Sequence, residues 1–182
     1  MFIFIVFMIV VSCKTTIIKT MNPTSDHLRL DDYDNYPTVF LNPDYKGMVQ
    51  LEDSNQIIQL QNNVLEGNFI LFSLIKKDDN CFEVIAWNSS DESFIGIGKI
   101  RSDVPICIYS RQYIPKKNPL KLYADPNLNS SCVSDTTYRT DALRVVDSYK
   151  KWLQVKLLIN NKEYIGWLPP NMQCANVYST CN

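Results

Sequence analysis

The sequence predicts an all-β protein made of two halves that repeat one pattern of strands. Short apolar runs, several of them alternating with polar residues, are bounded by Asn, Asp, Ser and Pro, which is typical of strands and turns. Apolar residues at the i, i+3 and i+4 spacing of a helix are not sustained. The strand pattern stops at the Pro- and Lys-containing segment 113–119 and then starts again, which predicts a linker between two units.

The first unit, residues 36–112, is expected to contain short strands separated by polar turns. A dense apolar run is broken by the polar turn 76–80, and a further polar loop follows at 88–93. The region 53–67 fits either a short helix or a strand followed by a loop. The predicted strands are 38–41, 69–75, 82–87, 94–97 and 104–109.

The second unit, residues 120–182, is expected to contain a similar set of strands. Asn160 and Asn161 tolerate the positive φ of a tight turn and predict a hairpin. The predicted strands are 120–123, 143–146, 152–159 and 164–168, the last of them ended by Pro169 and Pro170.

The two units also share positions that predict a common topology. The distances in sequence between matching positions are longer in the first unit than in the second. This difference requires one insertion in the first unit, within the region 53–67. The matching positions are Pro43 with Pro126, Val84 with Val155, and Gly96 with Gly166.

An uninterrupted apolar run opens the chain and is closed by a cysteine. Residues 1–11 are all apolar, and they are fewer than the roughly 20 residues with which a helix crosses a bilayer. They match the apolar region of a secretory signal. The stretch Val10-Val11-Ser12-Cys13 resembles the bacterial lipobox, which implies a signal peptide of residues 1–12 and a lipid on Cys13. That lipid would be a diacylglyceryl thioether with a further acyl chain, such as palmitate, on the new amino group. The alternative is an uncleaved apolar tail packed on the domain.

Residues 13–35 are polar and are expected to tether the folded units to the membrane. The acidic group at 31–34 lacks the glycine and the distal Glu of a twelve-residue calcium loop, so we expect a solvated linker. Lys14 is not the acidic residue that retains some lipoproteins in the inner membrane. That resemblance favours an outer-membrane lipoprotein facing the periplasm.

Charge and histidine content exclude several classes of protein. The chain has 18 Lys and Arg against 19 Asp and Glu, so it lacks the basic footprint that nucleic acid requires. The single histidine, His27, lies in the predicted tether, where it cannot act as the base of a nucleophile in either unit. No Cys-x-x-Cys spacing occurs. We therefore expect no enzymatic activity, no cofactor and no metal.

Five cysteines remain once the lipid-bearing one is set aside, so at least one is expected to be free. Cys174 and Cys181 lie close together in a polar tail, and a disulfide between them would pin the C-terminus in an oxidising envelope. Cys132 is the alternative partner. Cys81 and Cys107 stand in apolar surroundings and are expected to be small buried hydrophobic side chains.

The second unit carries a short motif known from one family. Trp152-Leu153-Gln154-Val155 is followed by a hairpin and then by Gly166-Trp167. This order resembles the bacterial SH3 (SH3b) family over about a third of the chain, and the tail 173–181 resembles that of SH3-containing envelope lipoproteins of Bacteroidetes. The resemblance implies two tandem small SH3-like β-barrels. The first unit is divergent, because it lacks both tryptophans at the matching positions.

The resemblance also implies a lipid-anchored binding module of the cell envelope. Half-exposed aromatic rings present flat apolar faces on which a sugar or a peptide can stack. The candidate ligand-binding residues are Tyr123, Trp152, Tyr164 and Trp167. The expected ligand is a cell-wall peptide of peptidoglycan or an envelope protein. The alternative function is that of a structural or inhibitory protein, of the immunity type, which binds another protein.

Overall fold

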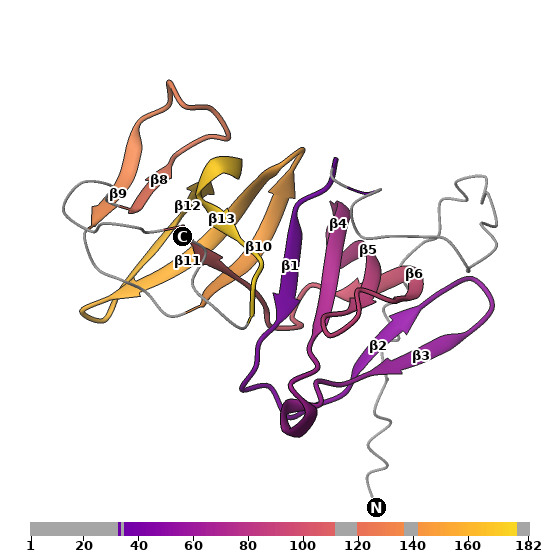
Figure 1. Ribbon diagram of the computed structural model, residues 1–182. Coiled ribbons are helices and arrows are strands. Elements are labelled where there is room, and N and C mark those ends of the chain that lie inside the picture. Colours follow the sequence, from indigo (N-terminus) through magenta and orange to yellow (C-terminus); the bar gives the residue numbers. More distant parts are fainter. Residues whose placement is uncertain (1–32, 34, 112–119, 137–141, 178–182) are drawn as a thin grey trace, which may run out of the picture.

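The computed structural model confirms the all-β fold (Figure 1). It describes residue 33 and residues 35–111, 120–136 and 142–177, and these residues contain thirteen strands and no α-helix. All the strands belong to one sheet, and every pairing of neighbours is antiparallel. The chain is therefore an antiparallel β protein, as its alternating apolar pattern predicts.

Six strands lie in the first half of the chain. The region 53–67 contains a strand and a short 3-10 turn, so the second of the two alternatives for that region is confirmed. The turn ends at Gly67, whose φ of 67° is one that glycine adopts without strain. The elements are β1 (Thr38–Leu41), β2 (Val49–Glu52), β3 (Ile57–Leu60), η3 (Val64–Glu66), β4 (Ile70–Asp78), β5 (Cys81–Asn88) and β6 (Phe94–Arg101).

The remaining strands form a similar series. Asn160 and Asn161 have φ values of 49° and 62°, which confirms the hairpin that they predict. The elements are β7 (Ile106–Ser110), β8 (Leu120–Tyr123), β9 (Cys132–Thr136), β10 (Leu143–Tyr149), β11 (Trp152–Ile159), β12 (Lys162–Leu168), η4 (Pro170–Met172) and β13 (Gln173–Cys174).

The strand order repeats from one half of the sheet to the other. It runs β3-β2-β6-β5-β4-β1 in the first half, and the second half has the equivalent order β9-β8-β12-β11-β10-β7. The halves meet where β1 pairs with β7, which places the two sets in one continuous sheet. The common topology is confirmed. The sheet is open at β3 and β9, and closure into two barrels stays a prediction.

The topology corrects two of the positional matches between the halves. Val155 lies opposite Gly166, but Val84 lies opposite Gly98, so Gly98 and not Gly96 is the structural equivalent of Gly166. Both glycines allow a neighbouring strand to approach closely. A Cβ at Gly98 would lie 2.5 Å from the Glu52 carbonyl oxygen. The match of Pro43 with Pro126 is also wrong, because the first follows β1 and the second follows β8.

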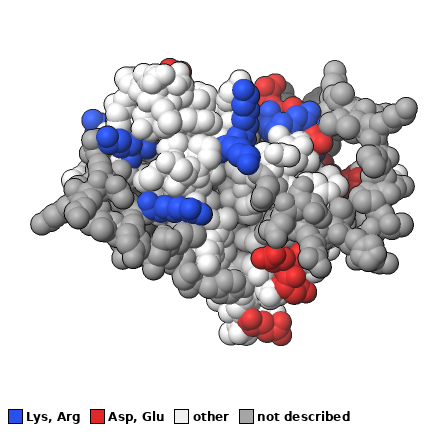
Figure 2. Space-filling view, turned by 45° about the horizontal axis from the view of Figure 1, so that its top comes forward, with Lys and Arg blue, Asp and Glu red and all other residues white. Residues whose placement is uncertain are grey.

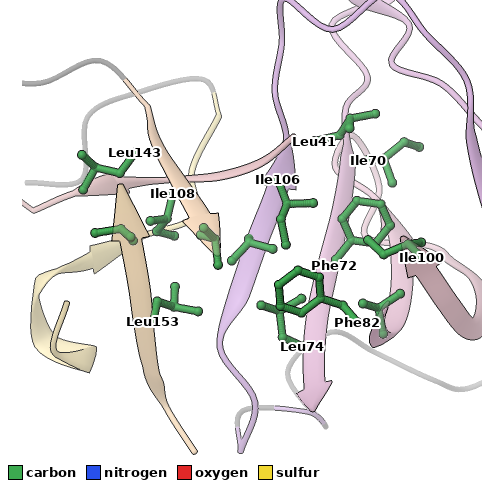
Figure 3. Packing of buried hydrophobic residues seen from close by; sticks show 14 of the residues in the cluster. Leu41, Ile70, Phe72, Leu74, Phe82, Ile100, Ile106, Ile108, Leu143 and Leu153 are labelled. Carbon is green, nitrogen blue, oxygen red and sulfur yellow. The ribbon is translucent and has the colours of Figure 1, made fainter. Parts of the chain in front are cut away.

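The main hydrophobic core crosses the junction between the halves. Leu41, Phe72 and Phe82 from the first half belong to the same buried cluster as Leu143 and Leu153 from the second. Figure 3 shows these side chains on neighbouring strands on both sides of β1, with no break between them. Because burial of apolar surface is the main stabilising contribution in folding, the two halves support one another.

A second cluster covers the opposite face of the central strands. Trp87 on β5 is fully buried, and its indole N–H donates a hydrogen bond to the Ser73 hydroxyl at 3.1 Å. Phe40 on β1 belongs to the same cluster. The Tyr33 ring lies 5.4 Å from the Trp87 ring between centroids, so contacts with the domain begin before residue 36.

Candidate functional site

Three of the four candidate ligand-binding side chains lie on one face of strands β8, β11 and β12. Tyr123, Trp152 and Trp167 are each half-buried. The rings of Tyr123 and Trp152 are 5.9 Å apart between centroids and almost perpendicular, at 89°, which is a favourable edge-to-face contact. Trp167 lies directly opposite Tyr123 in the pairing of β12 with β8. The structure therefore brings these three aromatic residues together.

The alternation of side chains along β11 determines this face. Leu153 and Val155 are buried in the main core, so Trp152 and Gln154 point to the opposite side of the sheet. Gln154 is paired with Trp167 on β12. An amide group, which can both donate and accept hydrogen bonds, thus lies beside the aromatic rings.

Tyr164 does not belong to this face. It lies opposite Leu157, which is buried, and it packs against the main core. The Lys162 ammonium lies 4.9 Å from the centroid of its ring. Residues three apart on one strand point to opposite faces, so Tyr164 and Trp167 cannot line the same surface.

Tyr149 joins the three aromatic residues instead, although it was not among the sequence candidates. It is the last residue of β10, lies opposite Trp152 in register and is 51% exposed. The sequence signal for it is the two-residue turn at 150–151, which makes the flanking residues Tyr149 and Trp152 a cross-strand pair. We call Tyr149, Trp152, Trp167 and Tyr123 the aromatic row, since they follow one another across β10, β11, β12 and β8.

A basic side chain lies against one end of the aromatic row. The Lys150 ammonium lies 5.4 Å from the centroid of the Tyr149 ring. Two carboxylates on the strands of the row have cationic partners: Asp147 on β10 lies 3.9 Å from Lys77, and Glu163 on β12 lies 3.1 Å from Lys156. In Figure 2 Lys and Arg side chains lie over the left and the centre of this face, and the Asp and Glu side chains lie mainly towards the right and bottom.

This arrangement suits the binding of a ligand. Aromatic side chains offer a large contact area with little loss of conformational entropy, and their flat faces stack on planar or ring-shaped groups. The described residues contain no group of three or more His, Cys, Asp or Glu side chains that could hold a metal ion. His27, the only histidine, lies outside the described residues.

The cysteines differ from the expectations at two positions. Cys81 is buried, as expected, but it is disulfide-bonded and not a simple apolar side chain. Cys174 is disulfide-bonded as well, while Cys132 is free, so the alternative pairing of these two is wrong. Cys107 is buried and free, as expected. Cys181, the favoured partner of Cys174, and the lipidation site Cys13 lie outside the described residues.

We expect the two free thiols to differ sharply in reactivity. Burial raises the pKa of the Cys107 thiol to about 11, whereas Cys132 is exposed and its thiol hydrogen-bonds to the Ser134 carbonyl oxygen at 2.9 Å. Alkylation requires the thiolate, so iodoacetamide at pH 8 should modify Cys132 and leave Cys107 intact until the protein unfolds. Mass spectrometry of the peptides measures both sites, and modification of both in denaturant is the control. Equal rates in the native protein would contradict the buried position of Cys107.

The Cys107 thiol also makes the stability of the protein depend on pH in the alkaline range. Because the folded protein holds the Cys107 proton more tightly than the unfolded chain, this contribution to stability is complete below pH 9. It is lost as the pH rises from 9 towards 11.

Comparison of the chain with family models, curated proteins and solved structures finds no match in any of the three. The resemblance to SH3b domains therefore stays a prediction. In the part of the chain that the structure describes, no helix has the length and apolar character needed to cross a membrane.

Proposed function

We propose that the protein is a lipid-anchored binding module of the cell envelope that holds a cell-wall peptide or an envelope protein. The aromatic row is the observation that carries this proposal, because it gathers four aromatic side chains on one face of the sheet. Most large aromatic side chains of a small domain are needed in its core, so such a gathering favours a ligand-binding surface. Its ligand would stack on the rings and hydrogen-bond to Gln154.

The anchor and the finer fold are parts of the same proposal. The apolar run that ends at Cys13 supports processing after residue 12 and a lipid that holds the protein on the outer membrane, facing the periplasm. The repeated strand order supports two units, and we propose that each is an SH3-like barrel. The module needs no cofactor, no metal and no catalytic residue.

Binding to purified peptidoglycan tests the proposal. The full chain, purified from membranes in detergent, should sediment with peptidoglycan, and Trp152→Ala should weaken binding by about tenfold or more, as loss of a central aromatic contact does. Leu158→Ala is the matched control, because Leu158 is exposed on the same strand and the same face, away from the row. Urea denaturation confirms that each variant is folded.

Two outcomes would overturn the peptidoglycan form of the proposal. One is the absence of wild-type protein from the pellet while a known peptidoglycan binder is retained. The other is equal retention of the Trp152→Ala and Leu158→Ala variants, because binding would then not depend on the aromatic row.

A further inference from the structure

The turn between β10 and β11 places two lysines at one end of the aromatic row. Lys150 and Lys151 join Tyr149 to Trp152, and both lysines are exposed. The Lys150 ammonium lies 5.4 Å from the centroid of the Tyr149 ring. A cation at this distance is attracted to the electron-rich face of the ring, so a positive charge is held beside the row.

The charges of these two lysines are not neutralised within the described part of the chain. Neither Lys150 nor Lys151 has a carboxylate partner among the described residues. Asp147, two residues before Tyr149, has the Lys77 ammonium at 3.9 Å as its partner. Both positive charges at the turn can therefore pair with a negative group on a ligand.

Gln173 holds the backbone of this turn in place. Its side-chain nitrogen donates to the Lys151 carbonyl oxygen at 2.7 Å and to the Leu168 carbonyl oxygen at 3.1 Å. Gln173 is the first residue of β13, which pairs with β7, so the turn is tied to the end of β12 and to β7. A site that is already positioned loses less conformational entropy when a ligand binds.

The half of the chain that carries the aromatic row is also the positively charged half. Residues 120–182 contain 7 Lys and Arg and 5 Asp and Glu, which is a net charge of +2. Residues 36–111 contain 6 Lys and Arg and 10 Asp and Glu, which is a net charge of −4. An anionic ligand is therefore attracted to the second half and repelled by the first.

We infer that the ligand of the aromatic row is an acidic cell-wall peptide, bound with a carboxylate beside Lys150 and Lys151 and the rest of its chain across β11, β12 and β8. This inference rests on the proposed function, because it takes the row as the binding surface. At about 4.8 Å between neighbouring strands, a row that crosses β10, β11, β12 and β8 spans about 14 Å. An extended peptide covers that distance with about four residues.

Amidation of the ligand tests the requirement for a carboxylate. Purified peptidoglycan is used in two forms, one native and one with its carboxyl groups converted to methylamides by a carbodiimide and methylamine. The full chain, in detergent, should bind the native form about fivefold more tightly, and this binding should weaken as ionic strength rises. Equal binding to the two forms would overturn the inference.

Substitution of the lysines tests where the carboxylate lies. Lys150→Gln and Lys151→Gln should each weaken binding by about two- to fivefold, as loss of an exposed ion pair does, and Lys150→Arg should bind as the wild type does because it keeps the charge. Lys162→Gln is the matched control. Lys162 is also exposed, and its ammonium also lies over a tyrosine ring, that of Tyr164 at 4.9 Å, but at the opposite end of β12 from the row.

The outcomes separate this inference from the proposed function. If the wild type binds and Trp152→Ala weakens binding, but Lys150→Gln and Lys151→Gln bind as Lys162→Gln does, the row is a binding surface and its assignment to an acidic ligand at this turn is wrong. If wild-type protein does not sediment with native peptidoglycan, the inference and the peptidoglycan form of the proposed function are both overturned.

Discussion

Replacing Cys13 by alanine is expected to release most of the protein from the membrane fraction. Each buried methylene group contributes about 0.8 kcal/mol to membrane binding, so two or more acyl chains hold a protein firmly, whereas the short apolar run alone does not. The wild-type protein should lack residues 1–12 and carry the mass of its acyl chains. The variant should carry no acyl mass. Fractionation and intact-mass spectrometry measure both effects.

Cys132→Ala is the matched control for this experiment, because it also removes a thiol but leaves Cys13 and the predicted lipobox intact. It should stay with the membrane. Wild-type protein without acyl mass, together with a Cys13→Ala variant that still fractionates with membranes, would refute the lipid anchor and favour the uncleaved apolar tail.

The cysteines provide an independent check on the anchor. With Cys107 and Cys132 free, disulfides within one chain can involve only the other four cysteines. Cys81 is disulfide-bonded. If Cys174 were bridged to Cys181, Cys13 would be the one partner left for Cys81, but the proposed lipid would occupy the Cys13 sulfur. Lipid on Cys13 and the Cys174–Cys181 bridge therefore exclude each other. Mass mapping of the unreduced protein shows which of the two is present.

The sequence predicts the long strands well and the shortest strands poorly. Both β4–β5 and β11–β12 have dense or alternating apolar runs, and both hairpins are present. β2 and β9 were not predicted, because segments of only four and five residues are too short for their pattern to stand out from the loops around them. The disulfide at Cys81 could not be expected from its apolar neighbours, because a disulfide depends on a partner that is distant in the sequence.

The candidate site was predictable in part. Trp152 and Trp167 follow from the family-like motif, but their common face follows from the pairing of β11 with β12, which sets Trp167 opposite Gln154. The alternation of β12 already excludes Tyr164 from that face. Tyr123 joins the row through the contact of β8 with β12, which no local pattern indicates.

Phe72→Ala is expected to destabilise both halves of the molecule together. Phe72 is fully buried on β4 and lies in the main core, where truncation of a phenylalanine costs about 3–5 kcal/mol. That core also contains Ile108 on β7 and Leu153 on β11, and β7 pairs with both β1 and β10. Loss of packing on β4 should therefore lower the stability of β11 as well. Hydrogen exchange in increasing urea, read on peptides from β5 and β11, should give one shared midpoint that falls in the variant.

Leu128→Ala is the control for this prediction, because Leu128 is 61% exposed and its truncation should change stability by less than about 0.5 kcal/mol. If β11 kept its wild-type midpoint while β5 unfolded early, the two halves would be independent domains. That result would contradict a shared core, since a cluster of side chains that interlock across β1 and β7 cannot lose one side and leave the other unchanged. A common shift would instead mean that the aromatic row in the second half depends on packing in the first.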